Sequence, residues 1–414
     1  MDEPTRCVAT RRERPSRTLV AAGTGTPEVS LTSASVMGRR RFLTLAGGAV
    51  MLNALGPSLA LARRASSIES GLQPWTLPAE PAANSLDRAR ALIGAAVLAP
   101  SHWNAQPWRF EVEGDEIRLT ADPARALPAT DPDRRAMMVG LGAALENLLI
   151  AARAWGIQPT VEYFPGPLAY DVVARVTLMG GAPRRDRALF EMIPERRTNR
   201  RSYDGRGIYP QNRAQLLAQF SGDARLHWLD DRARIRELAD LTHDATRTEG
   251  ENRRAAAEQA SWMREDRGDA RRRGDGLTVD ALEYPGLAHW MPGRAFDPDS
   301  WFRRFGLESA ARQARDGLRS SGAVVLISTP TGGENAWVAA GQAYQRFALK
   351  ATQLGVAHQP VHAPIEFERA RPELLRRFGA GGEEPVLLVR LGHASAPDPT
   401  VRRSVALVAT FRTT

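Results

Sequence analysis

The residues best suited to chemistry gather in a short run over residues 98–110. Ser101, Asn104 and Gln106 bring a hydroxyl and two amides close together, and Pro100 disfavours the helical conformation of the residue before it. An apolar helical stretch therefore ends here, and the alternation of apolar and polar residues after the turn predicts a strand with one buried face. We expect the turn to be fixed between a helix and a strand. The alternative is a turn whose polar side chains only satisfy buried backbone groups.

This run resembles the P-S-x-x-N-x-Q-P-W-x-F element of the nitroreductase superfamily, flavoenzymes that bind FMN between two α+β units. The matching positions are Pro100, Ser101, Asn104, Gln106, Pro107, Trp108 and Phe110. The resemblance implies an α+β, nitroreductase-like fold. It also implies that Ser101, Asn104 and Gln106 belong to a cofactor site, where Ser101 and Asn104 bond the flavin edge and Trp103 stacks on the flavin or shields it.

A second element of the resemblance is an arginine-rich run. It consists of Arg196, Arg197, Thr198, Asn199, Arg200 and Arg201. It is similar to the family's R-x-S-x-R-x-F pattern, whose arginines and hydroxyl hold the FMN phosphate, and a dianionic phosphate favours converging guanidinium groups. Two registers fit this pattern. One uses Arg196, Thr198 and Arg200, and the other uses Arg197, Asn199 and Arg201. An exposed basic turn or a cluster of ion pairs at an interface is the alternative.

Two further segments complete the resemblance. One is similar to the family's G-L-x-x-x-P-I segment, whose backbone meets the flavin ring and donates to its N5, and it contributes His358, Gln359, Pro360, Val361 and His362. Pro360 disfavours the regular helix that would bring the two histidines together, so we expect flavin contact and no metal. The other is Arg402 and Arg403 after the last predicted strand, where family members often place a basic residue at the phosphate. An exposed basic tail is the alternative.

Length and composition indicate a globular protein of two units. The chain has 414 residues, more than the roughly 250 to 300 at which single cores stop growing. Its 43% hydrophobic and 25% charged residues are ordinary for a globular protein. The net charge of +9 does not indicate nucleic-acid binding, because +4 of it lies in residues 1–62 and Lys350 is the only lysine. The Arg271–Arg273 run lies among acidic residues and is expected to be a solvated loop.

Residues 1–62 have the pattern of an export leader. A twin-arginine sequence, Gly38–Thr44, precedes a modestly apolar segment that ends in the small-residue cleavage site Ala60–Ala62. We expect the twin-arginine machinery to export the folded protein to the periplasm, with no stable membrane insertion after cleavage; an uncleaved signal would leave a membrane anchor. Met37 is an alternative start. The only cysteine, Cys7, precedes it, so a mature chain would have no disulfide or thiolate chemistry.

The turn is expected to lie in a first unit over residues 86–182, which follows a proline-rich linker at 63–85. The predicted elements are a helix Leu86–Leu98 capped by Ser85, a hairpin of strands Trp108–Val112 and Ile117–Thr120, a buried helix Arg134–Trp155, and strands Thr160–Phe164 and Val172–Leu178. Gly140 and Gly142 lie inside a helical pattern with no strand before it. This favours close helix packing over a dinucleotide-binding loop.

A second unit is expected over residues 183–414. The predicted elements are helical segments at Arg184–Ile193, Arg213–Glu265 and Trp337–Leu354, and strands at Val324–Ser328 and Val386–Leu391. The order of helix, Gly355, short loop and strand parallels the first unit, so the two resemble diverged copies. The stretch 274–301 is rich in glycine, proline and aromatic residues, and such a long loop in a compact domain is a candidate lid insertion.

The distribution of the two main motifs predicts a single site. In ordinary family members, two identical subunits each supply the arginine motif to one FMN and the P-S-x-x-N turn to the other. Here each motif occurs once, so the resemblance implies two fused, diverged units that form an internal pseudo-dimer with one FMN. This organisation is similar to the Acg-like branch of the family, where the flavin tends to be covered. We expect a monomeric pseudo-dimer.

The resemblance implies an FMN-dependent oxidoreductase. Such an enzyme takes electrons from NAD(P)H or another donor and passes them to nitroaromatic, quinone or similar acceptors. The flavin supplies the redox chemistry, so no side chain is expected to act as a catalytic acid or nucleophile. A lid over the flavin favours the alternative of a protein that sequesters or stores FMN with little turnover. A third alternative is an exported binding protein without flavin.

Overall fold

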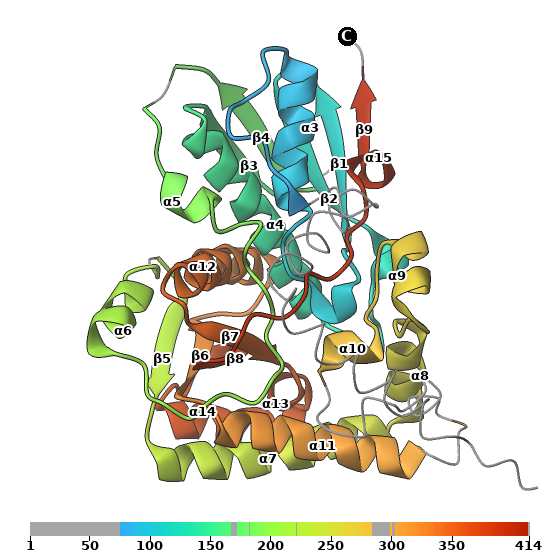
Figure 1. The fold of residues 1–414 in the computed structure, drawn as a ribbon, viewed down its shortest axis with the longest axis vertical. Coiled ribbons are helices and arrows are strands. Elements are labelled where there is room, and N and C mark those ends of the chain that lie inside the picture. The colour runs from blue at the N-terminus through green and yellow to red at the C-terminus, as the bar shows by residue number, and fades with distance from the viewer. Residues whose placement is uncertain are drawn as a thin grey trace, which may run out of the picture. The chain divides into compact units, whose positions relative to one another are not determined.

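The computed structural model describes residues 75–166, 172–181, 183–220, 222–283, 299 and 303–412. The described residues form two β-sheets with helices between and around them (Figure 1). The predicted leader 1–62, the beginning of the linker 63–85 and most of the candidate lid insertion 274–301 lie outside the described residues.

The first half of the fold follows the predicted order of elements. It contains α3 (Ser85–Ala96), the 3-10 helix η2 (His102–Asn104), β1 (Trp108–Glu113), β2 (Glu116–Ala121), η3 (Pro123–Arg125), α4 (Arg135–Ala154), β3 (Gln158–Tyr163) and β4 (Val172–Met179). The predicted cap of the first helix is wrong. Asn84 caps α3, because its side-chain oxygen accepts a hydrogen bond from the Asp87 N–H, whereas Ser85 is already inside the helix.

The second half contains more elements than predicted. They are α5 (Arg187–Phe190), α6 (Pro210–Leu217), β5 (Arg225–Leu229), α7 (Arg232–Glu251), α8 (Arg253–Ser261), α9 (Arg267–Arg273), α10 (Val279–Leu282), α11 (Arg303–Arg319), β6 (Ala323–Thr329), α12 (Glu334–Gln353), β7 (Ala357–Val361), α13 (Ala363–Glu366), η6 (Glu368–Ala370), α14 (Arg371–Phe378), β8 (Glu384–Gly392), α15 (Val405–Val408) and β9 (Ala409–Arg412). The predicted strands at β6 and β8 and the long helix at α12 are confirmed.

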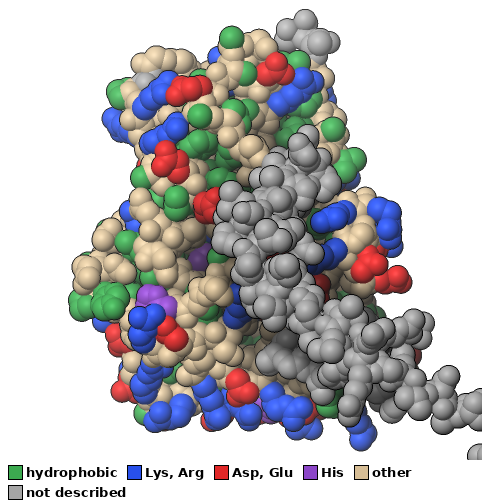
Figure 2. Space-filling view, in the orientation of Figure 1, with side chains coloured by type: hydrophobic (Ala, Val, Ile, Leu, Met, Phe, Trp, Pro, Cys, Tyr) green, Lys and Arg blue, Asp and Glu red, His purple; other side chains and the backbone are tan. Residues whose placement is uncertain are grey.

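Four local predictions in this half are wrong. The helix predicted at 184–193 is reduced to the short α5, and β5 interrupts the region predicted as helical. A strand, β7, replaces the short loop predicted after Gly355, and because β7 lies at the edge of its sheet it tolerates Pro360. The Arg271–Arg273 run lies in helix α9 instead of a loop, where Asp269 pairs with Arg272 and Arg273. Basic and acidic side chains accordingly lie side by side over α9 (Figure 2).

The two sheets have the same topology. In each half, two strands are followed along the chain by a long helix and then by two more strands. In space, the strands of the first half lie in the order β3-β4-β2-β1, and those of the second half lie in the corresponding order β7-β8-β6-β5. All pairings within these two sets of strands are antiparallel. The two halves therefore repeat one order of strands.

The final strand departs from the predicted boundary between the units. Strand β9 pairs in parallel with β1, with Phe110 opposite Ala409, so the end of the chain belongs to the first sheet. Only part of the predicted unit 183–414 therefore belongs to the second sheet. Residues 183–392 contain the second sheet, and the tail returns to the first (Figure 1).

The core helices α4 and α12 pack directly on each other. A Cβ atom added to Gly142 of α4 would overlap the Val338 carbonyl of α12, and a Cβ on Gly341 of α12 would overlap the Val139 carbonyl of α4. The prediction of close helix packing is confirmed for Gly142, whereas a Cβ on Gly140 would reach only Ser101 and Pro100 of the turn, the nearest atom at 3.5 Å. Helix α4 is long and apolar enough to span a membrane, with a mean hydropathy of 1.4, but this stretch is wholly buried inside the fold.

Candidate functional site

The turn between α3 and β1 has an unusual backbone. Trp103, Asn104 and Gln106 have φ angles of 49°, 55° and 53°, in the left-handed region that residues other than glycine seldom adopt. The Ser101 hydroxyl accepts a hydrogen bond from the Gln106 N–H at 2.9 Å, and the Asn104 N–H donates to the Ser101 carbonyl at 3.0 Å. Backbone strain of this kind persists only where the surroundings impose it, so the turn is held in one conformation.

Two amide side chains of the turn are bound by the protein itself. Asn104 donates to the carbonyls of Gly276 and Val401 at 3.0 and 3.1 Å, and its oxygen accepts from Arg402 at 3.0 Å. Gln106 is fully buried, donates to the Gly274 carbonyl and accepts from the Arg403 N–H. These amides join the turn to residues 274–276 and to the C-terminal tail. Within the part of the chain that the structure describes, the Ser101 hydroxyl accepts the hydrogen bond from the Gln106 N–H and donates none.

The arginine-rich run is extended, so alternate side chains point in different directions. Arg196, Thr198 and Arg200 line cavities, whereas Asn199 donates to the Ser395 carbonyl and Arg201 pairs with Glu283. Of the two registers that the sequence left open, the first therefore faces the site. The neighbouring Arg197 also lines a cavity, and its guanidinium lies over the Trp75 ring.

Buried arginines gather on one side of this site. Arg196 is 2% exposed and Arg402 is 7% exposed, and neither has a carboxylate partner among the described residues. The Nε atoms of both lack a hydrogen-bond partner in that part of the chain. Burial, together with repulsion from Arg196 and Arg197, lowers the pKa of Arg402 well below its usual value. A cluster of buried cations without counter-charge favours an anion with several acceptor oxygens, such as a phosphate.

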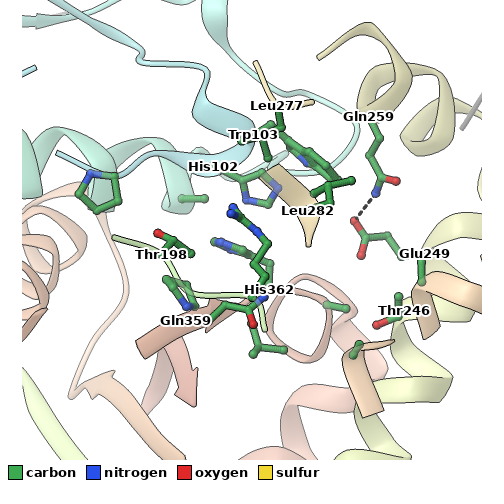
Figure 3. A pocket seen from close by; sticks show the side chains of 18 of the residues that line it. His102, Trp103, Thr198, Thr246, Glu249, Gln259, Leu277, Leu282, Gln359 and His362 are labelled. Carbon is green, nitrogen blue, oxygen red and sulfur yellow. Dashed lines mark hydrogen bonds between the residues drawn. The ribbon is translucent and has the colours of Figure 1, made fainter. Parts of the chain in front are cut away.

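The cavity beside these arginines is large. It has a volume of about 290 Å³ and shares Pro100, Ser101, Thr198, Arg200 and Leu277 with the smaller arginine-lined cavity. Its walls come from the turn before β1, from α4 and from the end of β7. They also come from α7, α8 and α11 of the second half. Figure 3 shows Thr198 and Gln359 at one end of the cavity and Glu249 with Gln259 at the other. Both halves of the fold thus build one site.

Neutral histidines occupy the centre of the site. His102 from the first half and His362 from the second have ring centroids 4.0 Å apart. Burial, followed by repulsion from Arg200, lowers the pKa of His362 to about 4. His358, a predicted site residue, lies on β7 and is not among the residues that line the two cavities, and burial together with Arg196 lowers its pKa to about 3. Burial also lowers the pKa of His102 well below its usual value. The three rings therefore stay uncharged at neutral pH, and the positive charge of the site comes from arginine.

The remaining predicted residues take part in different ways. Gln359, Pro360 and Val361 line the cavity, as do Pro100 and Trp103. Arg403 packs against the turn, with Asp122 at 3.8 Å, and does not line either cavity described here. No group of three or more histidine, cysteine, aspartate or glutamate side chains able to hold a metal occurs among the described residues.

Glu249 was not identified by the sequence analysis. Its carboxyl faces the cavity from α7 and accepts a hydrogen bond from the Gln259 amide at 3.1 Å (Figure 3). Thr246 lies one turn earlier on the same helix and also lines the cavity. A single glutamate in a highly charged helix belongs to no motif, and only the amphipathic spacing of α7 could have indicated that it faces inward.

The geometry fits a planar ligand that carries a phosphate. The arginines at one end supply an anion site, and the adjoining cavity is lined by apolar groups and a few polar ones from both halves. Pockets of this kind bind cofactors and small aromatic molecules. Such a ligand would lie across the boundary between the halves.

Comparison with known proteins gives relatives over most of the chain. No family model matches. The protein named "Putative NAD(P)H nitroreductase Rv3131" of Mycobacterium tuberculosis is 30% identical over 329 residues, which cover 77% of this chain and 90% of that protein. "Uncharacterized protein Rv3127" of the same organism is 27% identical over 341 residues, 77% of this chain and 92% of that protein. "Putative NAD(P)H nitroreductase acg" matches over 81 residues at 38% identity, 20% of this chain and 24% of that protein.

Solved structures give weaker likenesses. The FMN-dependent nitroreductase NfnB from Mycobacterium smegmatis in complex with NADPH has a TM-score of 0.30 and 15% identity, over 53% of this chain and 91% of that one. The protein named "putative nitroreductase" from Anabaena variabilis has a TM-score of 0.36 and 13% identity, over 68% of this chain and 69% of that one. At these scores the likenesses carry no argument, and the sequence relatives determine the assignment.

Proposed function

The chain belongs to the nitroreductase-like superfamily, and from this membership we propose that it is an FMN-dependent oxidoreductase that accepts electrons from NAD(P)H. The proposal is carried by one observation. Arg196 and Arg402, buried without a carboxylate partner among the described residues, adjoin a cavity that both halves of the fold line. A phosphate-bearing flavin would offset this charge and place its ring in the cavity.

The side chains have distinct roles in this proposal. Arg196 and Arg402 hold the phosphate, assisted by Arg197. The Thr198 and Ser101 hydroxyls, which lie where the two cavities meet, donate to the ribityl chain or to the ring edge. When bound, FMN supplies two-electron transfer between a nicotinamide and an acceptor. The protein contributes binding, orientation and exclusion of water, and the neutral His102 and His362 rings add no competing cation at the centre.

The visible spectrum of the purified protein tests this proposal. A yellow protein that bleaches when NADPH is added under anaerobic conditions, and recovers its colour with a nitroaromatic or a quinone, is the expected result. A protein that contains no flavin and takes up none when it is mixed with FMN would contradict it.

Flavin sequestration is the second candidate function. It is supported by the strap that residues 274–276 form across the turn, where Gln106 and Asn104 bond to Gly274 and Gly276. Such a strap limits access to the site from that side. The same spectrum separates the two functions, because a storage protein bleaches with dithionite and does not bleach with NADPH.

We further propose that the protein acts as a monomeric pseudo-dimer and is exported. The repeated strand order and the single composite site support the first part. The twin-arginine pattern Gly38–Thr44 supports the second part, and the export machinery would then be a partner of the folded, flavin-loaded chain. Light scattering of the purified protein and fractionation of cells with R39K/R40K substitutions test the two parts separately.

A further inference from the structure

The cavity has an end that the flavin proposal does not use. This end is lined by Thr246 and Glu249 of α7, Gln259 of α8, Leu282 of α10 and Leu307 of α11. We call these five residues the acid compartment. Apart from Glu249, its two polar neighbours and Gln313 of α11, whose amide donates to the Leu282 carbonyl at 2.9 Å, the walls here are apolar. Figure 3 shows the carboxyl group of Glu249 and the amide of Gln259 on the opposite side of the cavity from Thr198 and Gln359.

Glu249 has one hydrogen-bond partner and no ion pair among the described residues. Burial raises the pKa of this carboxyl to about 7, against the opposing effect of the hydrogen bond from Gln259 and with a further increase from the nearby Glu258. The carboxyl can therefore carry a proton near neutral pH, and its second oxygen has no hydrogen-bond partner among the described residues. A buried acid of this kind in a cavity is a candidate functional group.

The charged groups around Glu249 already have partners. Glu258 of α8 accepts hydrogen bonds from the backbone and hydroxyl of Thr130. Glu366 of α13 pairs with Arg135 of α4 at 3.0 Å. On α7 itself, Arg247 pairs with Glu251 at 3.4 Å on the exposed side. None of the described cations is therefore directed at Glu249, and the positive charge of the site lies at the other end.

We propose that the acid compartment binds the electron acceptor, and that Glu249 holds a flat, uncharged aromatic molecule by donating a hydrogen bond to a nitro or carbonyl oxygen. The inference rests on the proposed function. The apolar walls favour an uncharged ring, and a carboxyl with no cation beside it donates a hydrogen bond more readily than it binds an anion. Glu249 is thus a residue that positions the acceptor and sets its selectivity.

The acid compartment has no counterpart in the first half, because it comes from a segment that only the second half contains. Strands β1 and β2 are joined by the tight turn at Gly114–Asp115, whereas the helices α7 to α11 are inserted between β5 and β6. The acid compartment comes from this insertion. We infer that the insertion gives the protein its acceptor specificity.

Equilibrium dialysis of nitrobenzene against the oxidised protein, without an electron donor, tests the proposal without turnover. Binding should weaken about tenfold between about pH 5.5 and about pH 8.5, because the carboxyl loses its proton and with it the hydrogen bond. Glu249→Gln keeps a donor and should bind with nearly unchanged affinity at both pH values. Glu249→Met removes the donor and should bind about tenfold more weakly at the lower pH.

The controls separate the possible failures. Glu251→Gln, on the exposed side of the same helix, should behave as the wild type, and thermal unfolding shows whether each variant is folded. The FMN absorbance of the same samples reports on the proposed function independently. Equal binding by the wild type, E249Q and E249M in flavin-containing protein would overturn the role of Glu249 alone. Stronger binding of 4-nitrobenzylammonium than of nitrobenzene at the higher pH would identify a cation site instead and would also overturn it.

Discussion

The two halves of the fold share a framework and differ in the segments attached to it. Each has four antiparallel strands in the same order, with a 20-residue helix after the second strand. In the first half the strands before that helix are joined by a tight turn. In the second half they are joined by a helical insertion that provides one end of the cavity. The framework is repeated because it forms the core, and the site arises where the connections have diverged.

The same contrast applies to the loops at the site. The strained turn 101–106 lies between α3 and β1 of the first half, and the arginine run precedes α6 of the second half. The segment that precedes α3 carries Trp75 instead of arginines, and this ring lies under the guanidinium groups of Arg197 and Arg402. Each half thus supplies what the other lacks, which gives one site in place of two.

The largest expected effect concerns the crossing of α4 and α12, where the halves meet most closely. Gly142→Ala should lower the free energy of unfolding by about 2 to 3 kcal/mol, because the new Cβ overlaps the Val338 carbonyl and the helices must move apart. Gly341→Ala should cost a similar amount, since its Cβ meets the Val139 carbonyl in the same way. Urea unfolding measures both changes.

Gly94→Ala on α3 is the matched control for the crossing. Its Cβ would have only the Leu77 Cδ2 within reach, at 3.9 Å, so the substitution should stabilise the helix by up to about 1 kcal/mol. If Gly142→Ala and Gly341→Ala were as harmless as this control, or if their costs differed widely, the symmetry of the crossing would be refuted.

The next largest effect is a substitution that should act in opposite directions on the flavin-loaded and the flavin-free protein. Arg196→Gln should weaken FMN binding about 10- to 100-fold, because one charge-assisted contact with the phosphate is lost. The flavin-free protein should become more stable, since a buried cation without a counter-charge has been removed. Fluorescence titration with FMN and thermal unfolding of both forms measure the two effects.

Arg201→Gln provides the comparison within the same run. Arg201 is exposed and pairs with Glu283, so its loss should change FMN affinity by less than about threefold. An equal loss of affinity in both variants would mean that the register of the run has been assigned incorrectly.

The elements that the sequence predicted well are those with a long and consistent pattern. Helix α4 has apolar residues all round and is buried at every position except Arg153, and β6 is a continuous apolar run. Strands β5 and β7 were missed because both are edge strands: the five residues of β5 are mostly half-exposed, and β7 contains Pro360. Their formation depends on pairing with β6 and β8, which local propensity does not reveal.

The site was predicted in part for a similar reason. The motifs located the turn and the arginine run, but the sequence could not decide between Arg196 and Arg197 in the register, because an extended backbone exposes alternate residues to different surroundings. The role of Asn104 also differs from the simple expectation for its motif, since the chain itself satisfies its amide. Glu249 belongs to no motif, so only the spacing of the buried face of α7 could have indicated it, and its burial depends on the packing of α7 against α8 and α11.

A smaller effect concerns the histidines between the halves. Burial lowers the pKa of His358 to about 3 in the folded protein, whereas its ordinary value is about 6.5. Below about pH 6.5 the unfolded chain takes up a proton that the folded protein does not, so His358 reduces stability as pH falls. The cost of His358→Gln should therefore shrink by about 1 kcal/mol per pH unit between about pH 6.5 and about pH 5.

Urea unfolding of both proteins across this range measures the difference. Taking the difference between variant and wild type removes the opposite contribution of Glu249 and Glu366, whose raised pKa values stabilise the fold as pH decreases. His243→Gln on the outer helix α7 is the control. A cost of His358→Gln that stays constant with pH would show that this ring is charged, or solvated, in the folded protein.

The smallest effect compares the helices that precede the first strand of each half. Asn84 caps α3 with its side chain, whereas α6 begins at Pro210 with no side-chain cap. Asn84→Ala should lower the free energy of unfolding by about 1 kcal/mol, because the Asp87 N–H loses its acceptor. Ser85→Ala, at the position that the sequence indicated as the cap, should change it by less than about half that amount because Ser85 lies within the helix. Thermal unfolding of the two variants measures both losses of stability. A greater loss for Ser85→Ala than for Asn84→Ala would identify Ser85 as the cap, and α3 would then begin one residue later.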